Sequence, residues 1–336
     1  MDTPRRTSTE QDALRERVRE AAQPRGGVFR RSDLASWDLE PTLVVTMVRN
    51  GSWVRLHHGV YADRLTVDAA VTVEARHLLN AAAAVAAIAG PVSLFGPTAA
   101  LACGLPVHRR ALGTVHLVRP RGHDSRALRR RVSSRDHLPA AAIHVIDITD
   151  DEVTKERGLP TVTRELAAWS AALFSPPDWA VAVLDAAAWQ SPEALRTMEE
   201  YGTRWPRLVG TGEARRALQH ARTGAQSPLE SLSRVRLVRE GLAEPSLQVP
   251  ISDRDGLIGY VDMLFDDLGV VGEADGHVKY ETREDLLREK SREDRLRATG
   301  LAVVRWDWAQ ASGSMRKVAA NIMRASAHSR PWRRSA

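Results

Sequence analysis

Residues 259–276 read GYVDMLFDDLGVVGEADG, and this stretch decides the fold of the C-terminal part of the chain. Two apolar runs flank the turn signal DDLG at residues 266–269, so the pattern predicts a β-hairpin. If the turn is centred on Asp267 and Leu268, Asp262 lies directly opposite Glu273. Alternation along both strands then produces one wholly apolar face, which we expect to face the core. The residues of that face are Val261, Met263, Phe265, Val270, Gly272 and Ala274.

Three acidic side chains occupy the other face of the hairpin: Asp262, Glu273 and Asp275. Directly opposite side chains have Cβ atoms about 5 Å apart, and like charges there are destabilising unless a positive charge lies between them. A divalent cation is the simplest candidate. Because carboxylate oxygens are present without a His/Cys set, Mg²⁺ or Mn²⁺ is favoured over zinc. Such an ion can activate water and stabilise charge on a phosphodiester, so the pattern predicts hydrolysis of nucleic acid with these three acids as metal ligands.

The sequence around the hairpin predicts a helix, three strands, a helix, a strand and a final helix between residues 227 and 325. Ser227 and Pro228 are typical of a helix start, and Gly300 ends a charged helix over residues 282–299. The following run, residues 301–306, is apolar enough for a strand. The expected fold class is therefore α/β (α+β), with an αβββαβ arrangement at the C-terminal end.

The first 64 residues predict a small DNA-binding fold. A helical stripe ends near Pro24, and a second short helix opens at Pro41 and stops at the Asn-Gly pair of residues 50–51. Residues 53–57 and 60–61 then read as a hairpin around residues 58–59. Short helices followed by a β-wing outline a winged helix-turn-helix. The DNA-facing candidates are Arg49, Arg55 and His57.

Composition limits the class of protein. The chain has 336 residues with 48 Lys+Arg against 42 Asp+Glu, a net charge of +6 that is a weak field at this length. One cysteine, Cys103, excludes an internal disulfide framework and a cysteine-based zinc site. The longest apolar run is about half of what spans a bilayer, so we expect a cytoplasmic protein without a membrane partner. The predicted division is 1–64, a middle α/β domain over 65–225, a third domain over 226–325 and a basic tail over 326–336.

The C-terminal motifs resemble a known family. They are SPLE at 227–230, VD at 261–262, GEADG at 272–276 with KY at 279–280, EKSRE at 289–293 and GLAVVR at 300–305. Together they are similar to the endonuclease-related domains allied to very-short-patch-repair enzymes, within the PD-(D/E)XK nuclease superfamily. The resemblance covers roughly the last hundred residues. It implies a restriction-endonuclease-like fold and DNA hydrolysis that depends on Mg²⁺ (or Mn²⁺).

Carried over residue by residue, the resemblance implies that Asp262 and Glu273 are metal ligands and that Glu230 reaches the site from its helix. The sequence departs from the superfamily pattern at one position. The lysine expected two residues after the second acid is replaced by Asp275, and Lys279 is the nearest substitute. The implied catalytic set is Glu230, Asp262, Glu273 and Lys279.

Structural explanations remain open for each of these residues. Asp262 and Glu273 could face solvent on a half-exposed hairpin. Glu230 stands three residues after Ser227, which is the spacing of a capping box. Asp275 precedes a glycine and equally fits a turn. A lysine such as Lys279 is more often a solvated surface residue than a catalytic one.

The N-terminal motifs resemble a second family. GVFRR at 27–31, GSWVRL at 51–56 and GVYA at 59–62 are similar to the AbiEi-type antitoxin winged helix of actinobacterial proteins. This resemblance implies DNA binding and carries less weight for a cognate toxin partner.

Two functions of different classes follow from the sequence. The leading hypothesis is a DNA-binding protein with a metal-dependent endonuclease domain that cuts through Asp262 and Glu273. The alternative is a non-catalytic transcriptional regulator, or type IV antitoxin-like repressor, whose C-terminal fold is a scaffold. The sequence leaves the oligomeric state and the recognised DNA open.

Overall fold

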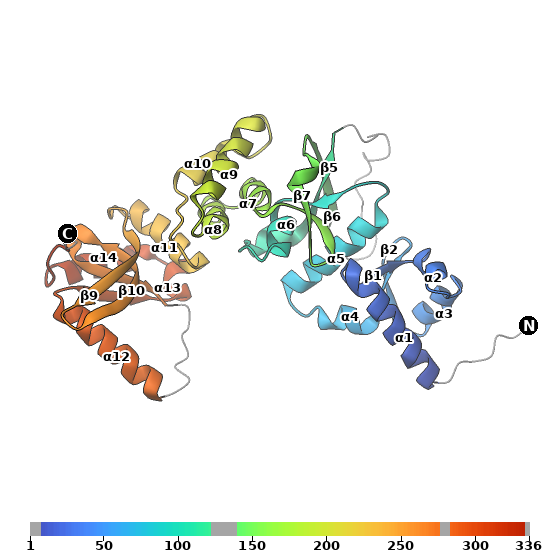
Figure 1. Ribbon diagram of the computed structural model, residues 1–336, viewed down its shortest axis with the longest axis horizontal. Helices are drawn as coiled ribbons and strands as arrows, with labels where there is room; N and C mark the ends of the chain where they lie inside the picture. Colours follow the sequence, from blue (N-terminus) through green and yellow to red (C-terminus); the bar gives the residue numbers. More distant parts are fainter. Residues whose placement is uncertain (1–7, 122–139, 276–282, 333–336) are drawn as a thin grey trace, which may run out of the picture. The chain divides into compact units, whose positions relative to one another are not determined.

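The computed structural model describes residues 8–121, 140–275 and 283–332, and the chain divides into two compact units. Unit 1 comprises residues 1–175 with 204–211, and unit 2 comprises residues 176–203 with 212–336. Both contain helices and sheets, as Figure 1 shows, so the predicted mixed α/β class is confirmed. In the described part of the chain, no helix is long and apolar enough to cross a membrane.

The N-terminal part of unit 1 is a three-stranded sheet with helices. Its elements are α1 (Ser8–Ala22), β1 (Val28–Arg30), α2 (Asp33–Ser36), α3 (Leu43–Arg49), β2 (Trp53–His57) and β3 (Val60–Asp63). The predicted hairpin is present as β2 and β3, and β1 joins it by pairing antiparallel with β3. The sequence analysis did not predict β1, because three residues are too few for a periodic signal. A core of apolar residues from α1, α2, α3 and the sheet surrounds Trp53 and Phe29.

The remainder of unit 1 is built around a five-stranded mixed sheet in the order β6-β5-β4-β8-β7. The strands are β4 (Ser93–Leu94), β5 (Thr114–Pro120), β6 (Ala140–Ile146), β7 (Val153–Glu156) and β8 (Leu159–Val162). The helices are α4 (Arg64–Ala69), α5 (Val73–Ala87), α6 (Gly96–Ala102) and α7 (Arg164–Ala172).

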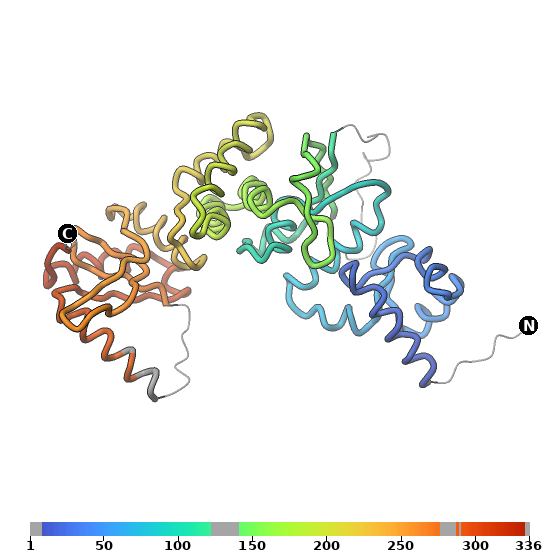
Figure 2. The backbone as a smooth tube through the Cα atoms, in the orientation of Figure 1, coloured from blue at the N-terminus to red at the C-terminus, as the bar shows by residue number. Residues whose placement is uncertain are grey.

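Unit 2 contains a four-stranded sheet in the order β12-β11-β10-β9, in which only β11 and β12 are parallel. The strands are β9 (Ser246–Asp253), β10 (Gly256–Phe265), β11 (Val270–Ala274) and β12 (Ala302–Trp306). The helices are α8 (Pro177–Ala188), α9 (Pro192–Arg204), α10 (Thr211–Gln219), α11 (Pro228–Arg239), α12 (Arg283–Ala298), α13 (Trp308–Ser312) and α14 (Met315–Ser326). Figure 2 follows the backbone through the same elements. The predicted order of helix, three strands, helix, strand and helix is present, with the short α13 added before α14.

The hairpin register predicted from the sequence is confirmed. Phe265 pairs with Val270 and Met263 pairs with Gly272. The expectation of a single buried face is wrong, because Leu264 and Val271 on the opposite face are also fully buried. They belong to a second core that includes Leu296 of α12. A sheet covered by helices on both faces cannot leave one side to solvent.

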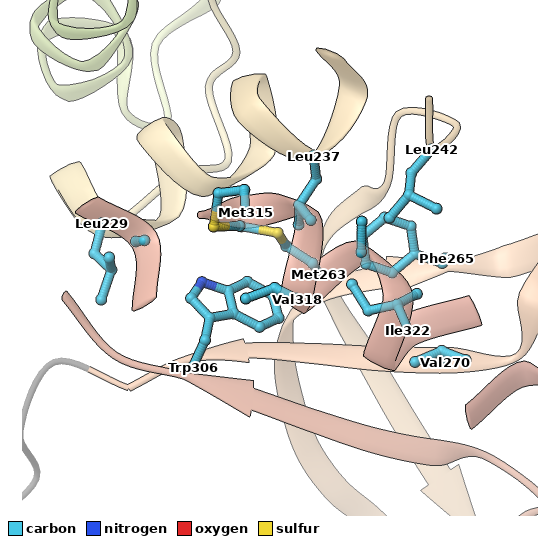
Figure 3. Close-up of a cluster of buried hydrophobic side chains, with 12 residues drawn as sticks. Leu229, Leu237, Leu242, Met263, Phe265, Val270, Trp306, Met315, Val318 and Ile322 are labelled. Atoms are coloured by element: carbon cyan, nitrogen blue, oxygen red, sulfur yellow. The ribbon is translucent and has the colours of Figure 1, made fainter. Parts of the chain in front are cut away.

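The other face of the sheet packs on α11 and α14. Figure 3 shows the side chains that meet there. They include Leu237, Met263, Phe265, Val270, Trp306, Met315, Val318 and Ile322. The Trp306 indole donates a hydrogen bond to Ser233 Oγ at 2.7 Å. A Cβ added at Gly272 would lie 2.7 Å from the Trp306 ring, so this strand position needs a glycine.

The described part of the basic tail lies against the hairpin turn. Ser329 Oγ donates to Leu268 O at 2.6 Å, and Trp332 N donates to Asp266 O at 2.8 Å. Gly269 has φ +63°, and a Cβ there would collide with Arg330 O. The chain end therefore helps to hold the turn in place.

The helices before α11 pack with it in unit 2. Arg234 of α11 is almost fully buried and contacts Asp185 of α8 at 2.9 Å and Glu244 at 2.7 Å. A buried arginine of this kind needs such partners, because an unpaired buried charge is costly. The sequence analysis assigned α8 to its middle domain, and its three-domain division stays a prediction.

Candidate functional site

The predicted site residues occur in two separate places. Arg49, Arg55 and His57 belong to unit 1. Glu230, Asp262, Glu273 and Asp275 belong to unit 2 and are called here the acidic cluster. Lys279, the predicted substitute for the superfamily lysine, lies outside the described residues.

Glu230 enters the acidic cluster from the first turn of α11. Ser227 is the N-cap and accepts a hydrogen bond from the Glu230 backbone N–H at 3.2 Å. The Glu230 carboxylate accepts a bond from the Gln226 backbone N–H at 3.0 Å, one residue before the N-cap. Its side chain is buried. The helix-capping explanation is therefore correct in part, and the same carboxylate also takes part in the cluster.

Gln248 of β9 joins Glu230 to Asp262, and the sequence analysis missed it. Its side-chain Nε2 is 3.3 Å from Glu230 Oε2 and 3.5 Å from Asp262 Oδ1. The β9–β10 register places Gln248 across from Asp262, because Leu247 pairs with Met263 and Val249 with Val261. The amide therefore lies between two carboxylates from different elements.

The backbone at Gln248 is unusual for a strand. Its φ is +48°, in the left-handed region that costs a non-glycine residue about 1–2 kcal/mol. Leu247 packs in one apolar core and Val249 in the other, although residues two apart normally share a face of a strand. The paired residues Met263 and Val261 of β10 are divided between the two cores in the same way, so both strands change direction here, and Val261 does not share the predicted face with Met263. No composition or spacing signal reveals it.

Asp262 is half-buried and close to other acids. Its Oδ2 accepts a hydrogen bond from the Ala274 backbone N–H at 3.0 Å. Burial, followed by the nearby Glu230 charge, raises the pKa of Asp262 to about 6. Among the described residues neither Glu230 nor Asp262 forms an ion pair with a lysine or arginine. Extra positive charge at this point, a proton or a cation, would therefore be stabilised.

Glu273 has a different environment, because two arginines bind it. Arg292 of α12 contacts Glu273 Oε1 at 2.7 Å, and Arg305 of β12 contacts Oε2 at 2.8 Å. Arg305 also lies 3.6 Å from Asp275. The positive charge that the sequence analysis assigned to a divalent cation is supplied at Glu273 by the protein itself. The sequence could not reveal this pairing, because Arg292 is most simply explained by contacts within its own charged helix.

The donor groups fit a divalent cation only in part. In the described ranges, no group of three or more His, Cys, Asp or Glu side chains is arranged to hold a metal ion. Glu230 and Asp262 still bring hard carboxylate oxygens to one amide, and Mg²⁺ commonly uses one or two carboxylates together with substrate phosphate oxygens. Glu273 and Asp275 fit less well, because arginines already contact them. Mg²⁺ or Mn²⁺ at this site stays a prediction.

The three predicted DNA-facing residues differ in how available they are. Arg49 is exposed at the end of α3, and its side chain has no partner among the described residues. Arg55 is exposed, but its guanidinium contacts His57 O at 3.4 Å and His58 Nδ1 at 2.8 Å. Burial lowers the pKa of His57 below its ordinary value, which favours the neutral imidazole. His57 is therefore poorly suited to bind a phosphate by charge.

Comparison with known families matches one part of the chain. The family model described as "Transcriptional regulator, AbiEi antitoxin" matches residues 16–62. These residues run from α1 to β3 and include β1, α2, α3 and the hairpin. The chain therefore carries an AbiEi antitoxin-like transcriptional regulator domain at its N-terminal end. The match gives no support for an endonuclease domain in residues 226–325. No curated protein matches the chain.

Proposed function

We propose that this protein is a DNA-binding transcriptional regulator and that residues 16–62 form its DNA-binding domain. The observation that carries the proposal is the agreement between the family match and the order of elements. The matched residues contain helix, strand, two helices and a hairpin, and the first strand completes the sheet by pairing with the last. This is the arrangement of a winged helix, which reads DNA with a helix and a β-wing. The proposal includes no toxin partner.

The charges of the matched segment support the proposal. Residues 16–62 contain seven arginines and five acidic residues. Five of the arginines contact other groups of the protein: Arg17, Arg19, Arg25, Arg30 and Arg55. The side chains of the other two, Arg31 and Arg49, are exposed and have no partner within the described structure. Exposed arginines without internal partners are available for phosphate oxygens.

Binding of the full chain to duplex DNA tests the proposal. The duplex is the region upstream of the protein's own reading frame, and its affinity is measured by fluorescence anisotropy at several salt concentrations. We expect a Kd of about 10 nM for a specific site and an affinity that falls steeply with salt. An affinity no stronger for this duplex than for a scrambled one of equal composition, at every salt concentration, contradicts regulation at this promoter. Absence of binding to both contradicts the proposal as a whole.

As a second candidate we propose that unit 2 hydrolyses DNA with a divalent cation. Support comes from the convergence of Glu230 and Asp262 on Gln248, and from the raised pKa of Asp262, which favours added positive charge. Asp262 and Glu230 would hold Mg²⁺ or Mn²⁺, and Glu273 would contribute if Arg292 and Arg305 released it. The ion, when bound, would activate water and stabilise the charge on the phosphodiester.

Cleavage assays separate the two candidates. Supercoiled and linear DNA are incubated with the full chain in Mg²⁺ or Mn²⁺, and wild type is compared with Asp262→Asn and Glu273→Gln. The nuclease candidate expects cleavage that chelation of the metal and both substitutions abolish. If wild type binds DNA and leaves it intact, the regulator proposal stands alone. Cleavage that survives both substitutions points to a contaminating nuclease and contradicts the assignment of these acids.

A further inference from the structure

Unit 1 contains a cavity where its N-terminal sheet meets the elements that follow. The cavity has a volume of about 310 Å³ and is bordered by β1, α5 and β8. β1 and α5 lie side by side there (Figure 1). This volume is at the lower end of the range for small-molecule pockets, about 300–1,000 Å³. Apolar residues form much of the wall: Val28, Ala82, Val85, Leu159 and Pro160.

The wall of this cavity is held in place by close packing. Val28, Ala82 and Leu159 are buried. The turn between β7 and β8 touches the chain just before β1, because a Cβ at Gly158 would lie 2.5 Å from Pro24 O. A ligand would therefore meet a preformed apolar surface, which lowers the cost of binding.

Arg30 supplies the positive charge of the cavity, which is called here the Arg30 cavity. Its Nε donates to Ala86 O, in the last turn of α5, at 2.6 Å. Its two terminal guanidinium nitrogens have no partner among the described residues. Asp33 also lines the cavity, but it is paired with Arg25 at 2.5 Å. Because the carbonyl end of a helix carries only about half a negative charge, the charge of Arg30 is not balanced.

A second cavity adjoins the first at Arg30 and Ala86. It has a volume of about 330 Å³, and its lining includes Arg31 and Ser32. The side chains of both residues are exposed and make no hydrogen bond or ion pair within the described structure. The described lining of this cavity includes no acidic residue. The surroundings of Arg30 therefore offer further donors and a second positive charge.

We propose that the Arg30 cavity binds a small organic carboxylate whose apolar body lies against Val85 and Leu159. The carboxylate accepts hydrogen bonds from the terminal nitrogens of Arg30, a pairing that guanidinium groups favour. β1 belongs to the matched residues 16–62, whereas α5 and β8 do not. The ligand therefore contacts both the matched segment and the part of unit 1 that follows it. The inference goes beyond the proposed DNA binding and does not depend on it.

A DNA phosphate is a poorer occupant of the Arg30 cavity. The backbone of a duplex brings charge to a protein surface, but it brings no apolar group to cover a wall such as that formed by Val85 and Pro160. Arg30 is also held against α5 through Ala86 O. Charge and apolar wall together complement a small molecule that carries both features.

Three probes test the inference on the full wild-type chain: benzoate, its neutral analogue benzamide, and acetate, which lacks the ring. Binding is measured by ligand-observed NMR titration at equal ionic strength, without DNA. We expect a Kd of about 1 mM for benzoate, a value reasonable for a ligand of about nine non-hydrogen atoms. Benzamide should bind about tenfold more weakly, because it lacks the charge. Acetate should also bind at least about tenfold more weakly, because it buries no apolar body.

Two variants test the two parts of the cavity separately. Arg30→Gln should weaken benzoate binding about tenfold and leave benzamide binding unchanged. Val85→Phe should abolish the binding of both, because the larger side chain fills the cavity. Matched controls are Arg110→Gln, at an exposed arginine outside both cavities, and Val71→Phe, at a valine that is 79% exposed. Both controls should bind benzoate like wild type, and circular dichroism checks that each variant is folded.

Several outcomes would overturn the inference. One is no wild-type binding of benzoate at about 10 mM, tenfold above the expected Kd. A second is equal affinity for benzoate and acetate, which would indicate only weak attraction of anions to the surface. Equal affinity for benzoate and benzamide contradicts the role of Arg30 without any variant. An equal loss in Arg30→Gln and Arg110→Gln would reduce the result to a general charge effect.

Discussion

The exposed polar residues of α3 in unit 1 (Thr42, Thr46 and Arg49) and the acidic cluster of unit 2 differ in how their polar groups are satisfied. At α3, the hydroxyls of Thr42 and Thr46 and the Arg49 guanidinium are exposed and have no partner within the described structure. In the acidic cluster, Gln248 bridges two carboxylates and two arginines hold Glu273. An exposed set without protein partners can bind a ligand without first breaking contacts inside the chain. A partly buried set with internal partners contributes first to stability, and Glu273 must leave its arginines before it can bind a metal ion.

The largest expected effect is on the stability of unit 2. Replacing Arg292 and Arg305 together by alanine leaves Glu273, which is 6% exposed, without its charge partners. We expect a loss of about 3 kcal/mol, because an unpaired buried charge is costly. Hydrogen exchange of β11 amides in the full chain measures it, and the DNA affinity of residues 16–62 should not change.

Two further variants control this prediction. Arg254→Ala removes an arginine that is almost fully exposed, with a loose ion pair at 3.8 Å, and should cost less than about 0.5 kcal/mol. Adding Glu273→Gln to the double alanine variant should restore part of the stability. If the double variant is as stable as wild type, the two arginines do not stabilise the buried Glu273 carboxylate. The acidic cluster then does not owe its stability to internal charge pairing.

The second effect is on DNA affinity. Arg31→Glu combined with Arg49→Glu replaces two free positive charges by negative ones, and we expect about a 100-fold loss of affinity at physiological salt. Stability should not change, because neither side chain has a partner among the described residues. Fluorescence anisotropy measures the affinity. Arg110→Glu, an exposed charge reversal outside residues 16–62, should cost far less, and equal losses for the two variants would indicate only a general charge effect.

The third effect concerns Asp262, whose pKa is raised to about 6. The folded protein holds this proton more tightly than the unfolded chain, so the contribution is present below pH 3.8 and is lost as the pH rises through 6. Asp262→Asn should therefore stabilise the protein by about 1–2 kcal/mol at pH 7, after allowance for solvent screening, and by little at pH 3.5.

Urea denaturation at the two pH values measures the difference at Asp262. A variant less stable than wild type at pH 7 would show that the bonds of Asp262 to Gln248 and Ala274 outweigh its charge. Added Mg²⁺ sharpens the comparison. It should stabilise wild type more than Asp262→Asn if the second candidate function is correct, and both equally if it is not.

The smallest expected effect is at the hairpin. Arg55 already contacts His57 O and His58. We therefore expect Arg55→Ala to weaken DNA binding only about threefold and to lower the slope of log affinity against log salt by about one unit. The measurement is the same anisotropy titration across salt. An unchanged slope would mean that the hairpin does not touch the DNA backbone.

Local sequence patterns predicted much of the fold. The β10–β11 register followed from alternation and from the turn that Gly269 allows, and the helix start at Ser227 followed from its capping pattern. These features depend on residues close together in the chain. The short strand β1 was missed because it exists only through pairing with β3, more than thirty residues later.

The candidate site was predictable only in part. The sequence placed Asp262 opposite Glu273, and the confirmed register agrees with this. It could not place Gln248 between Glu230 and Asp262, because that contact joins three elements and requires a positive φ in a strand. It also could not show that Arg292 and Arg305 converge on Glu273 from α12 and β12.

The sequence by itself therefore determined the order of elements over residues 227–325, the acidic hairpin and the outline of an N-terminal DNA-binding domain. Only the tertiary structure decided which charges are balanced inside the protein and which face outward. The physical reason is that secondary structure follows from periodicity and turns over a few residues. Burial and charge pairing depend instead on side chains brought together from distant segments, and they decide that Glu273 is neutralised while Arg49 stays free.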